Sequence, residues 1–540
     1  MATPYGIKLA VHLITNHFGN LVAKVCENLL RRGPLTLQQV IRYTELTPQQ
    51  VKNSLLILIQ HNCVQAFSLE SQGGFGDGPK ANTQYLVLFS NILHRMRFPK
   101  FLEIVSRELD QECKELLEGL LQNGRLTLVQ MVERAKSKRK DGCREDVVQE
   151  GLTKLLAAHF VERCPAPEPL VPEPVKVETT SKKRGAKSAK INEESETIEQ
   201  RVLAAAGPME AQRFSMLTNT EFDVNGETST DDSPSLIIGE KRKRDSLELD
   251  RESTAEEGEV VLWRANFEEF LRRLRHMACI ENVRASLDDG AVKVLKAKLD
   301  ATRGLEKKVK TEKSVPLSLD NIFEEVIKSE EGRVMTLDDV RASLVQLGCS
   351  ASARGTADSY SIDLKKIIES AQNDEVESIV LKRYGRDAYR IFRLLSKNGR
   401  LVETDKIPHL WKRRMRPRFF IRCGRMSTCI WRTTENLGLK SLIQFSTEVG
   451  FKKLVLAPNR NILLWKVNKR PLWEHVLDEM FHAALNLSLR AAYEWDKEKE
   501  VINPLEAMTK EERQKQKNIR ILLDSSLLKL DDAIMLFHNF

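Results

Sequence analysis

Two well-separated stretches of the chain share one pattern of apolar and polar positions. Residues 29–41 read LLRRGPLTLQQVI, and residues 120–132 read LLQNGRLTLVQMV. Each stretch continues into apolar positions at helical spacing and then into a short apolar strand, over residues 47–67 and 144–164. A repeat of this length is typical of one supersecondary unit that is used twice. We therefore expect two copies of one small domain before residue 165.

The first copy predicts two helices in succession. A first helix is expected over roughly residues 7–31, where apolar residues recur at helical spacing. Gly33 and Pro34 end this helix, and a short second helix is expected near residues 36–43. The apolar face of the first helix comprises Val11, Ile14, Phe18, Leu21, Val25 and Leu29.

A third helix and a hairpin complete the unit. Thr47 is a predicted N-cap, with Pro48 at the first helical position and Gln50 closing a capping box. Strands are expected at residues 63–67 and 84–89, on either side of the glycine-rich stretch 73–78. Three helices followed by two strands predict a winged helix. Its third helix should bury Val51, Leu55, Leu58 and Ile59 and expose Gln49, Lys52, Asn53 and Gln60.

The rest of the chain extends this organisation. Residues 327–347 and 391–407 repeat the pattern more faintly, so we expect four winged helices. A run rich in Pro, Ser and charge, residues 165–257, predicts a disordered linker. Two long helical patterns broken at Pro504 predict a C-terminal helical hairpin or coiled coil. The fold is thus expected to be mainly α with small β-wings, with winged helices at 1–90, 91–164, 258–370 and 371–468 and the hairpin at 469–540.

Composition excludes several classes of protein. The 540 residues carry a net charge of +9, so a basic patch for nucleic acid is permitted but must be local. The nine cysteines include no C-x-x-C pair, which argues against a zinc site. No phosphate-binding loop, metalloprotease or nucleophile motif is present, so we expect no catalytic residue, no bound metal and no cofactor. Neither a signal peptide nor a membrane span is expected.

Four segments carry a family resemblance. Residues 93–101 (LHRMRFPKF), 263–270 (WRANFEEF), 376–395 and the C-terminal LDDAIMLFHNF resemble, in order, segments of the large winged-helix subunit of the RNA polymerase III initiation heterotrimer. That family is itself similar to TFIIE alpha. The resemblance implies four winged helices and a C-terminal coiled coil. It also implies a trimer with two smaller subunits, docked on the polymerase clamp, and a non-catalytic nuclear role in promoter opening for tRNA, 5S and other small RNA genes.

Two other readings remain open. A stand-alone winged-helix transcription factor would explain the repeat, but it needs a third helix richer in Arg, Asn and Gln than residues 47–61. A winged-helix scaffold outside transcription would also explain the repeat. Neither explains the four family-like segments.

One stretch departs from the family. Residues 408–432 contain seven Arg, one Lys and no acidic residue, and they show neither helical nor strand periodicity. A shifted codon frame can give an amphipathic string that is similar to the family here. Our hypothesis is a frame or splicing error affecting residues 408–450. The alternative is an unusual basic insertion, which sequencing the transcript would establish.

Candidate sites for nucleic acid are scattered. DNA binding is expected to be weak and independent of base sequence, through cations on phosphates. For the third helix of the first unit, a protein-facing or solvated role is favoured over base reading. For the loop after residue 135, a plain flexible loop is favoured over backbone contact with nucleic acid. The segment after the first wing could equally be a solvated helix start or a contact with the partner subunits. The candidate phosphate contacts are Lys52, Arg95, Arg97, Lys100, Lys136, Lys138, Arg139 and Lys140.

Two further sets of residues are candidates for transport and assembly. A basic cluster in the linker is typical of a nuclear import signal, and it comprises Lys241, Arg242, Lys243 and Arg244. A hairpin of two helices cannot bury both of its apolar stripes within itself, so part of the stripe should pack on other domains or on a partner. The partner-binding candidates in this stripe are Leu523, Leu527 and Leu530.

Overall fold

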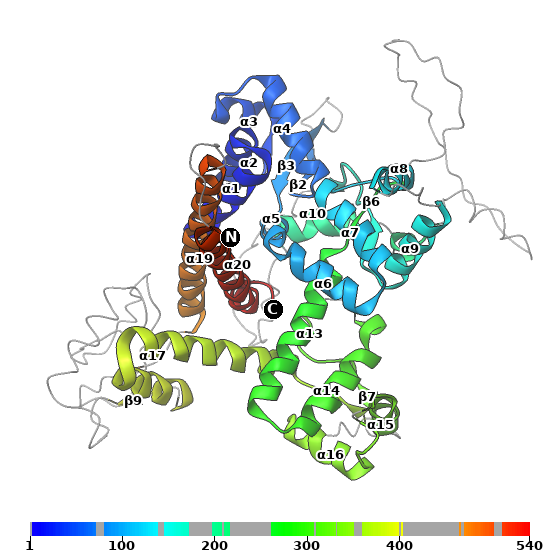
Figure 1. The fold of residues 1–540 in the computed structure, drawn as a ribbon, viewed down its shortest axis with the longest axis vertical. Helices are drawn as coiled ribbons and strands as arrows, with labels where there is room; N and C mark the ends of the chain where they lie inside the picture. The colour runs from blue at the N-terminus through cyan, green and yellow to red at the C-terminus, as the bar shows by residue number, and fades with distance from the viewer. Residues whose placement is uncertain are drawn as a thin grey trace, which may run out of the picture. The chain divides into compact units, whose positions relative to one another are not determined.

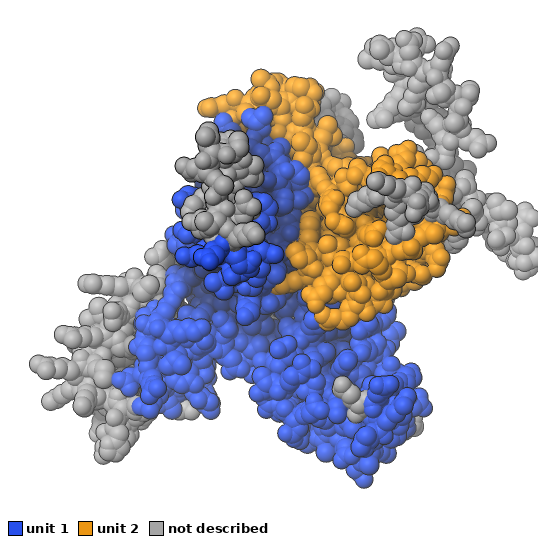
Figure 2. Space-filling view, viewed as in Figure 1, with its two compact units in different colours: residues 1–31, 92–97, 268–540 blue, residues 32–91, 98–267 orange. Residues whose placement is uncertain are grey.

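The computed structural model shows a mainly helical chain with small sheets (Figure 1). It describes residues 3–71, 80–138, 145–171, 197–207, 210–216, 261–306, 309–330, 332–349, 359–398, 401–402, 464–465, 469–501 and 510–540. The chain divides into two compact units, coloured separately in Figure 2. Unit 1 comprises Met1–Arg31, Ile92–Arg97 and Glu268–Phe540, and unit 2 comprises Arg32–Asn91 and Phe98–Phe267.

Unit 2 begins with the helix–turn–helix that the sequence predicts. Thr36 and Thr47 each close a capping box, on α3 and α4 respectively, because Gln39 and Gln50 stand three residues later. Val51, Leu55 and Leu58 of α4 are buried, as expected, and Ile59 is half-buried. The elements of this part are β1 Leu35–Thr36, α3 Leu37–Thr44, α4 Pro48–Gln60, β2 Val64–Ser71 and β3 Lys80–Val87.

The second copy of the repeat forms the rest of unit 2. Helices α7, α8 and α9 pack on one another, and the short strands β4 and β6 pair antiparallel beside them. Three helices and a small sheet make this copy a second winged helix. Its elements, with the flanking ones, are α6 Phe98–Glu108, α7 Gln111–Asn123, α8 Leu128–Lys138, α9 Glu145–Ala157, β4 Val161–Arg163, β5 Leu170–Val171, α10 Ile198–Ala206, α11 Glu210–Arg213 and β6 Trp263–Ala265.

A seam of hydrogen bonds joins the two copies. The side-chain amide of Gln60, at the end of α4, donates to the carbonyls of Asn123 (3.0 Å) and Arg125 (2.6 Å). Arg125 is buried and donates through Nε to Oδ1 of Asn62 at 2.9 Å. A Cβ atom at Gly124 would lie 2.0 Å from the Gln60 carbonyl oxygen, and Gly124 has a φ of +83°. The seam therefore requires glycine at this position of the repeat.

Unit 1 contains a further set of three packed helices, α14, α15 and α16, beside the paired strands β7 and β8. Their core is continuous and includes Leu295, Ile322, Val340 and Leu344, all fully buried. This is the helical order expected for the third winged helix. The elements are α13 Phe267–Ser286, α14 Asp289–Ala301, η2 Arg303–Leu305, β7 Leu317–Ser318, α15 Leu319–Lys328, α16 Leu337–Gln346 and β8 Ser359–Tyr360.

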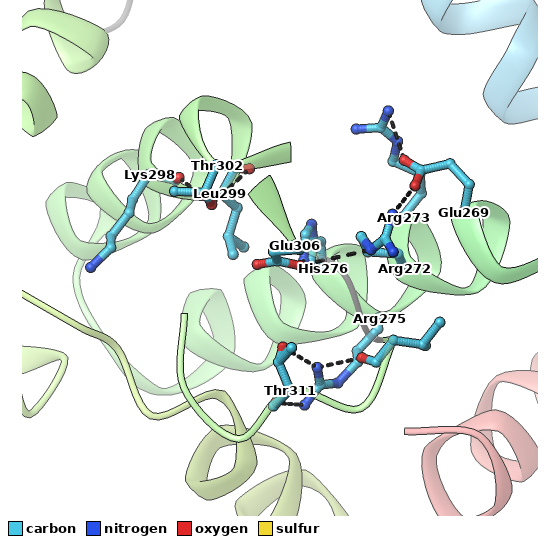
Figure 3. A network of polar contacts seen from close by, with 11 residues as sticks. Glu269, Arg272, Arg273, Arg275, His276, Lys298, Leu299, Thr302, Glu306 and Thr311 are labelled. Carbon is cyan, nitrogen blue, oxygen red and sulfur yellow. Dashed lines mark hydrogen bonds and ion pairs between the residues drawn. The ribbon is translucent and has the colours of Figure 1, made fainter. Parts of the chain in front are cut away.

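Charged side chains lie buried along α13 in this part of unit 1 (Figure 3). Glu269 forms ion pairs with Arg272 and, at 2.9 Å, with Arg273. His276 Nε2 lies 3.1 Å from Oε2 of Glu306. Arg275 donates to the carbonyl of Thr311 at 2.6 Å, which attaches the segment after η2 to α13. Buried charges need such partners, because an isolated one carries a large desolvation cost.

The two ends of the chain meet in unit 1. The sequence predicted one helix over residues 7–31, but the structure has two. The helical stretch breaks at Gly19, whose φ is +85°, into α1 Pro4–Phe18 and α2 Asn20–Arg32. Helix α1 packs on α19 (Lys469–Val501), and α19 packs on α20 (Lys510–His538). Arg520 stacks on Trp495 and His538 contacts Phe481, so the last two helices run antiparallel as a hairpin.

The predicted fourth winged helix lies mostly outside the described residues. Its described elements are the second half of α17 (Leu364–Asn398) and the paired strands β9 (Leu401–Val402) and β10 (Leu464–Trp465). The anomalous residues 408–450 are not among those that the structure describes. The hypothesis of a frame or splicing error therefore stays a prediction.

Candidate nucleic-acid and partner interfaces

Helix α4 occupies the position from which winged helices often read DNA. Its outer face exposes Lys52 and the amides of Gln49 and Asn53, which bond to each other at 3.0 Å. The same face exposes Leu56 at 64% and Ile57 at 37%. Base edges in a groove are read by donors and acceptors, whereas exposed aliphatic side chains are typical of protein contacts. This face is better suited to a protein partner than to DNA.

The wing of the first copy is extended by a later segment. Strand β5 pairs parallel with β2, giving the sheet order β1-β3-β2-β5. Glu168 accepts hydrogen bonds from Ser68 (2.6 Å) and Thr83 (2.5 Å), which lower the pKa of its carboxyl group. Val202 of α10 is fully buried in the core of this sheet with Phe67. The prediction of disorder from residue 165 onward is therefore wrong for β5 and α10.

The wing of the second copy is built from strands far apart in the sequence. Trp263–Ala265 pairs with Val161–Arg163, so the predicted linker is an insertion within this wing. Asn266 donates its side-chain amide to the carbonyl of His159 (2.9 Å) and its backbone N–H to that of Phe160 (2.9 Å). The family-like segment WRANFEEF thus has a structural role, and the second winged helix does not end at residue 164.

A piece of the insertion covers the outside of the second wing. Arg213 of α11 forms an ion pair with Glu162 at 2.5 Å, and Arg264 binds the other oxygen of the same carboxylate at 2.8 Å. The ring of Phe214 stacks on His159, with centroids 4.1 Å apart. Sequence reasoning missed both α10 and α11. For α10, the capping box of Thr197 and Gln200 before its apolar run was the available signal.

The candidate phosphate contacts occupy different environments. Lys52 and Lys136 are exposed, on α4 and α8. Lys138 is the last residue of α8, while Arg139 and Lys140 lie outside the described residues. The import candidates at 241–244 lie outside them too. The two described and exposed lysines of this set therefore lie on different helices of the two copies of the repeat.

The prediction that Arg97 contacts phosphate is wrong. This side chain is fully buried, and its Nε donates to Oδ1 of Asp531 at 2.9 Å. Its NH1 donates to Oδ1 of Asn539 at 2.8 Å and lies 3.1 Å from Nδ1 of His94. Burial, together with Arg97, holds the pKa of His94 well below its usual value. Arg97 therefore cannot be an exposed phosphate contact, because its donors serve to attach the C-terminal helix.

The neighbours of Arg97 are only partly exposed. The guanidinium of Arg95 lies 4.3 Å from the centroid of the Phe18 ring, and this side chain is half-buried. Lys100, on α6, is half-buried as well. Both remain candidates with less accessible charge than the sequence predicted.

The C-terminal hairpin presents apolar side chains outward. The partner-binding candidates Leu523, Leu527 and Leu530 are half-buried, whereas Ile521 and Leu522 are 57% and 66% exposed. On α19, Leu489 and Tyr493 are also exposed, at 47% and 60%. Large apolar side chains exposed on adjacent helices commonly mark a protein interface.

The described part of the chain lacks two features. No helix in that part of the chain is long and apolar enough to cross a bilayer. The same residues hold no group of three or more His, Cys, Asp or Glu side chains arranged for a metal ion.

The helix–turn–helix of α3 and α4, its repeat in α8 and α9, and the small wings define the chain as a tandem winged-helix protein. Residues 8–69 match the family model described as the RNA polymerase III subunit RPC82 helix-turn-helix domain. Residues 150–378 match the model described as RNA polymerase III subunit RPC82. The chain belongs to this family of RNA polymerase III subunits, which confirms the resemblance seen in the sequence.

Curated relatives agree with the family models. The zebrafish (Danio rerio) DNA-directed RNA polymerase III subunit RPC3 is 24% identical over 511 residues, covering 93% of this chain and 86% of that protein. The human subunit RPC3 is 26% identical, covering 72% of this chain and 68% of the human one. A Dictyostelium discoideum subunit of the same name is 29% identical over 31% of this chain and 28% of its own length.

Proposed function

We propose that this chain is the scaffold of an initiation heterotrimer of RNA polymerase III. In this role it binds two smaller subunits, docks on the polymerase clamp and contacts DNA while the promoter opens. Family membership supports assembly with other RNA polymerase III subunits, a nuclear role and the absence of catalysis by the chain itself. The transcripts would be tRNA, 5S and other small RNAs.

The observation that carries the scaffold role is the distribution of exposed apolar side chains. Leu56 and Ile57 lie on the outer face of α4, where a DNA-reading helix would carry polar donors. Ile521 and Leu522 lie outward on α20. A subunit that only bound DNA would gain nothing from these aliphatic surfaces. A scaffold with several protein partners would bury them. The same observation weakens the alternative of a stand-alone transcription factor.

Affinity purification tests this function. A tagged chain, expressed at its native level, should recover RNA polymerase III subunits. After a high-salt wash it should retain two smaller subunits in about equal molar amounts, because apolar interfaces resist salt that weakens ionic ones. Mass spectrometry provides the measurement. Recovery of the chain alone, or with a different complex, would refute the scaffold role.

A further inference from the structure

The second half of α17 carries cations on one side. Element α17 consists of two helical parts separated by a kink at Gly385, whose φ is +82°. The part after the kink, residues 386–398, reads RDAYRIFRLLSKN and contains four cations and a single acidic residue. In Figure 1 this element is drawn in yellow-green near β9.

Burial and charge divide this short helix into two opposite faces. Ala388, Phe392 and Leu395 are buried, at 2%, 4% and 1% exposure. With 3.6 residues per turn, they share one side of the helix. Arg386, Arg390, Arg393 and Lys397 fall within an arc of about 60° on the opposite side. We call these four residues the cationic stripe. All four are exposed.

Among the described residues, the charges of the stripe are only weakly neutralised. The Arg390 guanidinium lies 4.0 Å from the carboxylate of Asp387, and that of Arg393 lies 3.9 Å from Glu377. The side chains of Arg390 and Arg393 remain 57% and 50% exposed. The Glu377 side chain is only 18% exposed, but both guanidinium groups are solvated and both pairs are long. They therefore contribute little energy and leave the arginines available to a stronger acceptor. Arg393 also donates a hydrogen bond to the Tyr389 hydroxyl at 3.1 Å.

We propose that the cationic stripe binds the phosphate backbone of duplex DNA. The four positions span about 16 Å along the helix, and each DNA strand carries a phosphate about every 3.4 Å of duplex axis. Guanidinium groups bind phosphate with paired, charge-assisted hydrogen bonds. The four residues of the stripe are all cations, and the Tyr389 ring beside Arg393 is half-buried, whereas protein interfaces depend on aromatic or aliphatic anchors. That composition favours a nucleic-acid backbone over an acidic protein.

This inference deepens the DNA contact in the proposed function, but a separate measurement tests it. The full chain is titrated onto a fluorescein-labelled 20-base-pair duplex at several salt concentrations, and anisotropy gives the affinity. The test variant replaces Arg386, Arg390, Arg393 and Lys397 with Gln. A charge-matched control replaces four exposed cations elsewhere in unit 1, Arg284 of α13, Lys296 of α14, Arg341 of α16 and Lys366 at the start of α17, with Gln. Circular dichroism and thermal melting compare the folding of both variants with the parent.

The stripe variant should bind at least tenfold more weakly at low salt. Its plot of log affinity against log salt should be shallower by about 2–4 units, since each lost phosphate contact removes about 0.9. The control should keep nearly the parent slope. A third variant, with the three arginines changed to Lys, keeps the charge and should keep most of the slope, so the loss in the Gln variant can be assigned to charge. A fourth, with only Arg390 and Arg393 changed to Gln, should lose about half as much slope, which keeps the proposal testable if the fourfold variant folds poorly.

Three outcomes would overturn the proposal. The first is an unchanged slope in a folded stripe variant. The second is equal losses in the stripe variant and the charge-matched control. The third is intact DNA binding with loss of co-purifying polymerase subunits, which would assign the stripe to an acidic protein surface. An unchanged slope together with normal recovery of the polymerase would refute DNA binding by the cationic stripe and leave the proposed function intact.

Discussion

Replacing Arg97 with Ala should release the end of α20 from the rest of unit 1. Arg97 is fully buried and the Asp531 side chain is 1% exposed, so removing the arginine leaves a buried carboxylate without its cation. Breaking one side of a buried ion pair costs about 3–5 kcal/mol. Hydrogen exchange of the amides at residues 531–539 should accelerate by on the order of 100-fold or more.

Matched variants separate the ion pair from simple loss of packing. Arg97→Lys keeps the charge but loses the planar fork that reaches both Asp531 and Asn539, so it should show an intermediate effect. The double variant Arg97→Met with Asp531→Leu removes both charges and should be milder than Arg97→Ala, because no unpaired charge stays buried. Unchanged exchange at residues 531–539 in Arg97→Ala would show that this pair does not anchor the helix.

Changing Ile521 and Leu522 to Asp should detach the chain from its polymerase partners while the hairpin stays folded. Both side chains are more than half exposed, so the substitutions add little strain to the free chain. Each apolar side chain buried in an interface contributes about 1.5–3 kcal/mol, so losing both should weaken assembly by on the order of 100-fold. Pull-down from extracts measures the association, and circular dichroism checks helical content.

A triple variant of the half-buried leucines on the same helix is compared with this double variant. Asp at Leu523, Leu527 and Leu530 places charges in partly covered positions, and we expect loss of co-purifying polymerase subunits while the N-terminal winged helices stay folded. This triple variant should also lose helical content in the hairpin, unlike the double variant. If the Ile521 and Leu522 variant recovers the whole polymerase, the outward face of α20 is not a docking surface.

The sequence predicted what depends on neighbouring residues. The capping box at Thr47, Pro48 and Gln50 is local, and the structure confirms it. The buried positions of α4 follow from helical periodicity, and Val51, Leu55 and Leu58 were predicted correctly, whereas Ile59 is half-buried. The repeat gave the helical order of both copies, and its glycine at position 124 proved to be required where the copies meet.

What depends on distant residues was missed. Arg97 was predicted to be exposed, because its partner, Asp531, lies 434 positions away and nothing near Arg97 in the sequence indicates it. The second wing pairs strands at 161–163 and 263–265, and no periodicity joins them. The charged composition of residues 165–257 predicted disorder and concealed the short segment of α10 that buries Val202. The break at Gly19 was also missed, because the apolar spacing continues across it.

The central claim is that this chain acts at initiation without performing the chemistry. RNA polymerase III prepared without it is assayed on two templates, a closed tRNA promoter with its initiation factors and a duplex with a pre-opened, single-stranded tail. The account predicts normal RNA synthesis on the tailed template and none from the closed promoter, with promoter activity restored when the chain and its two smaller partners are added back. Normal promoter-directed synthesis in its absence, or loss of synthesis on the tailed template, would contradict the account.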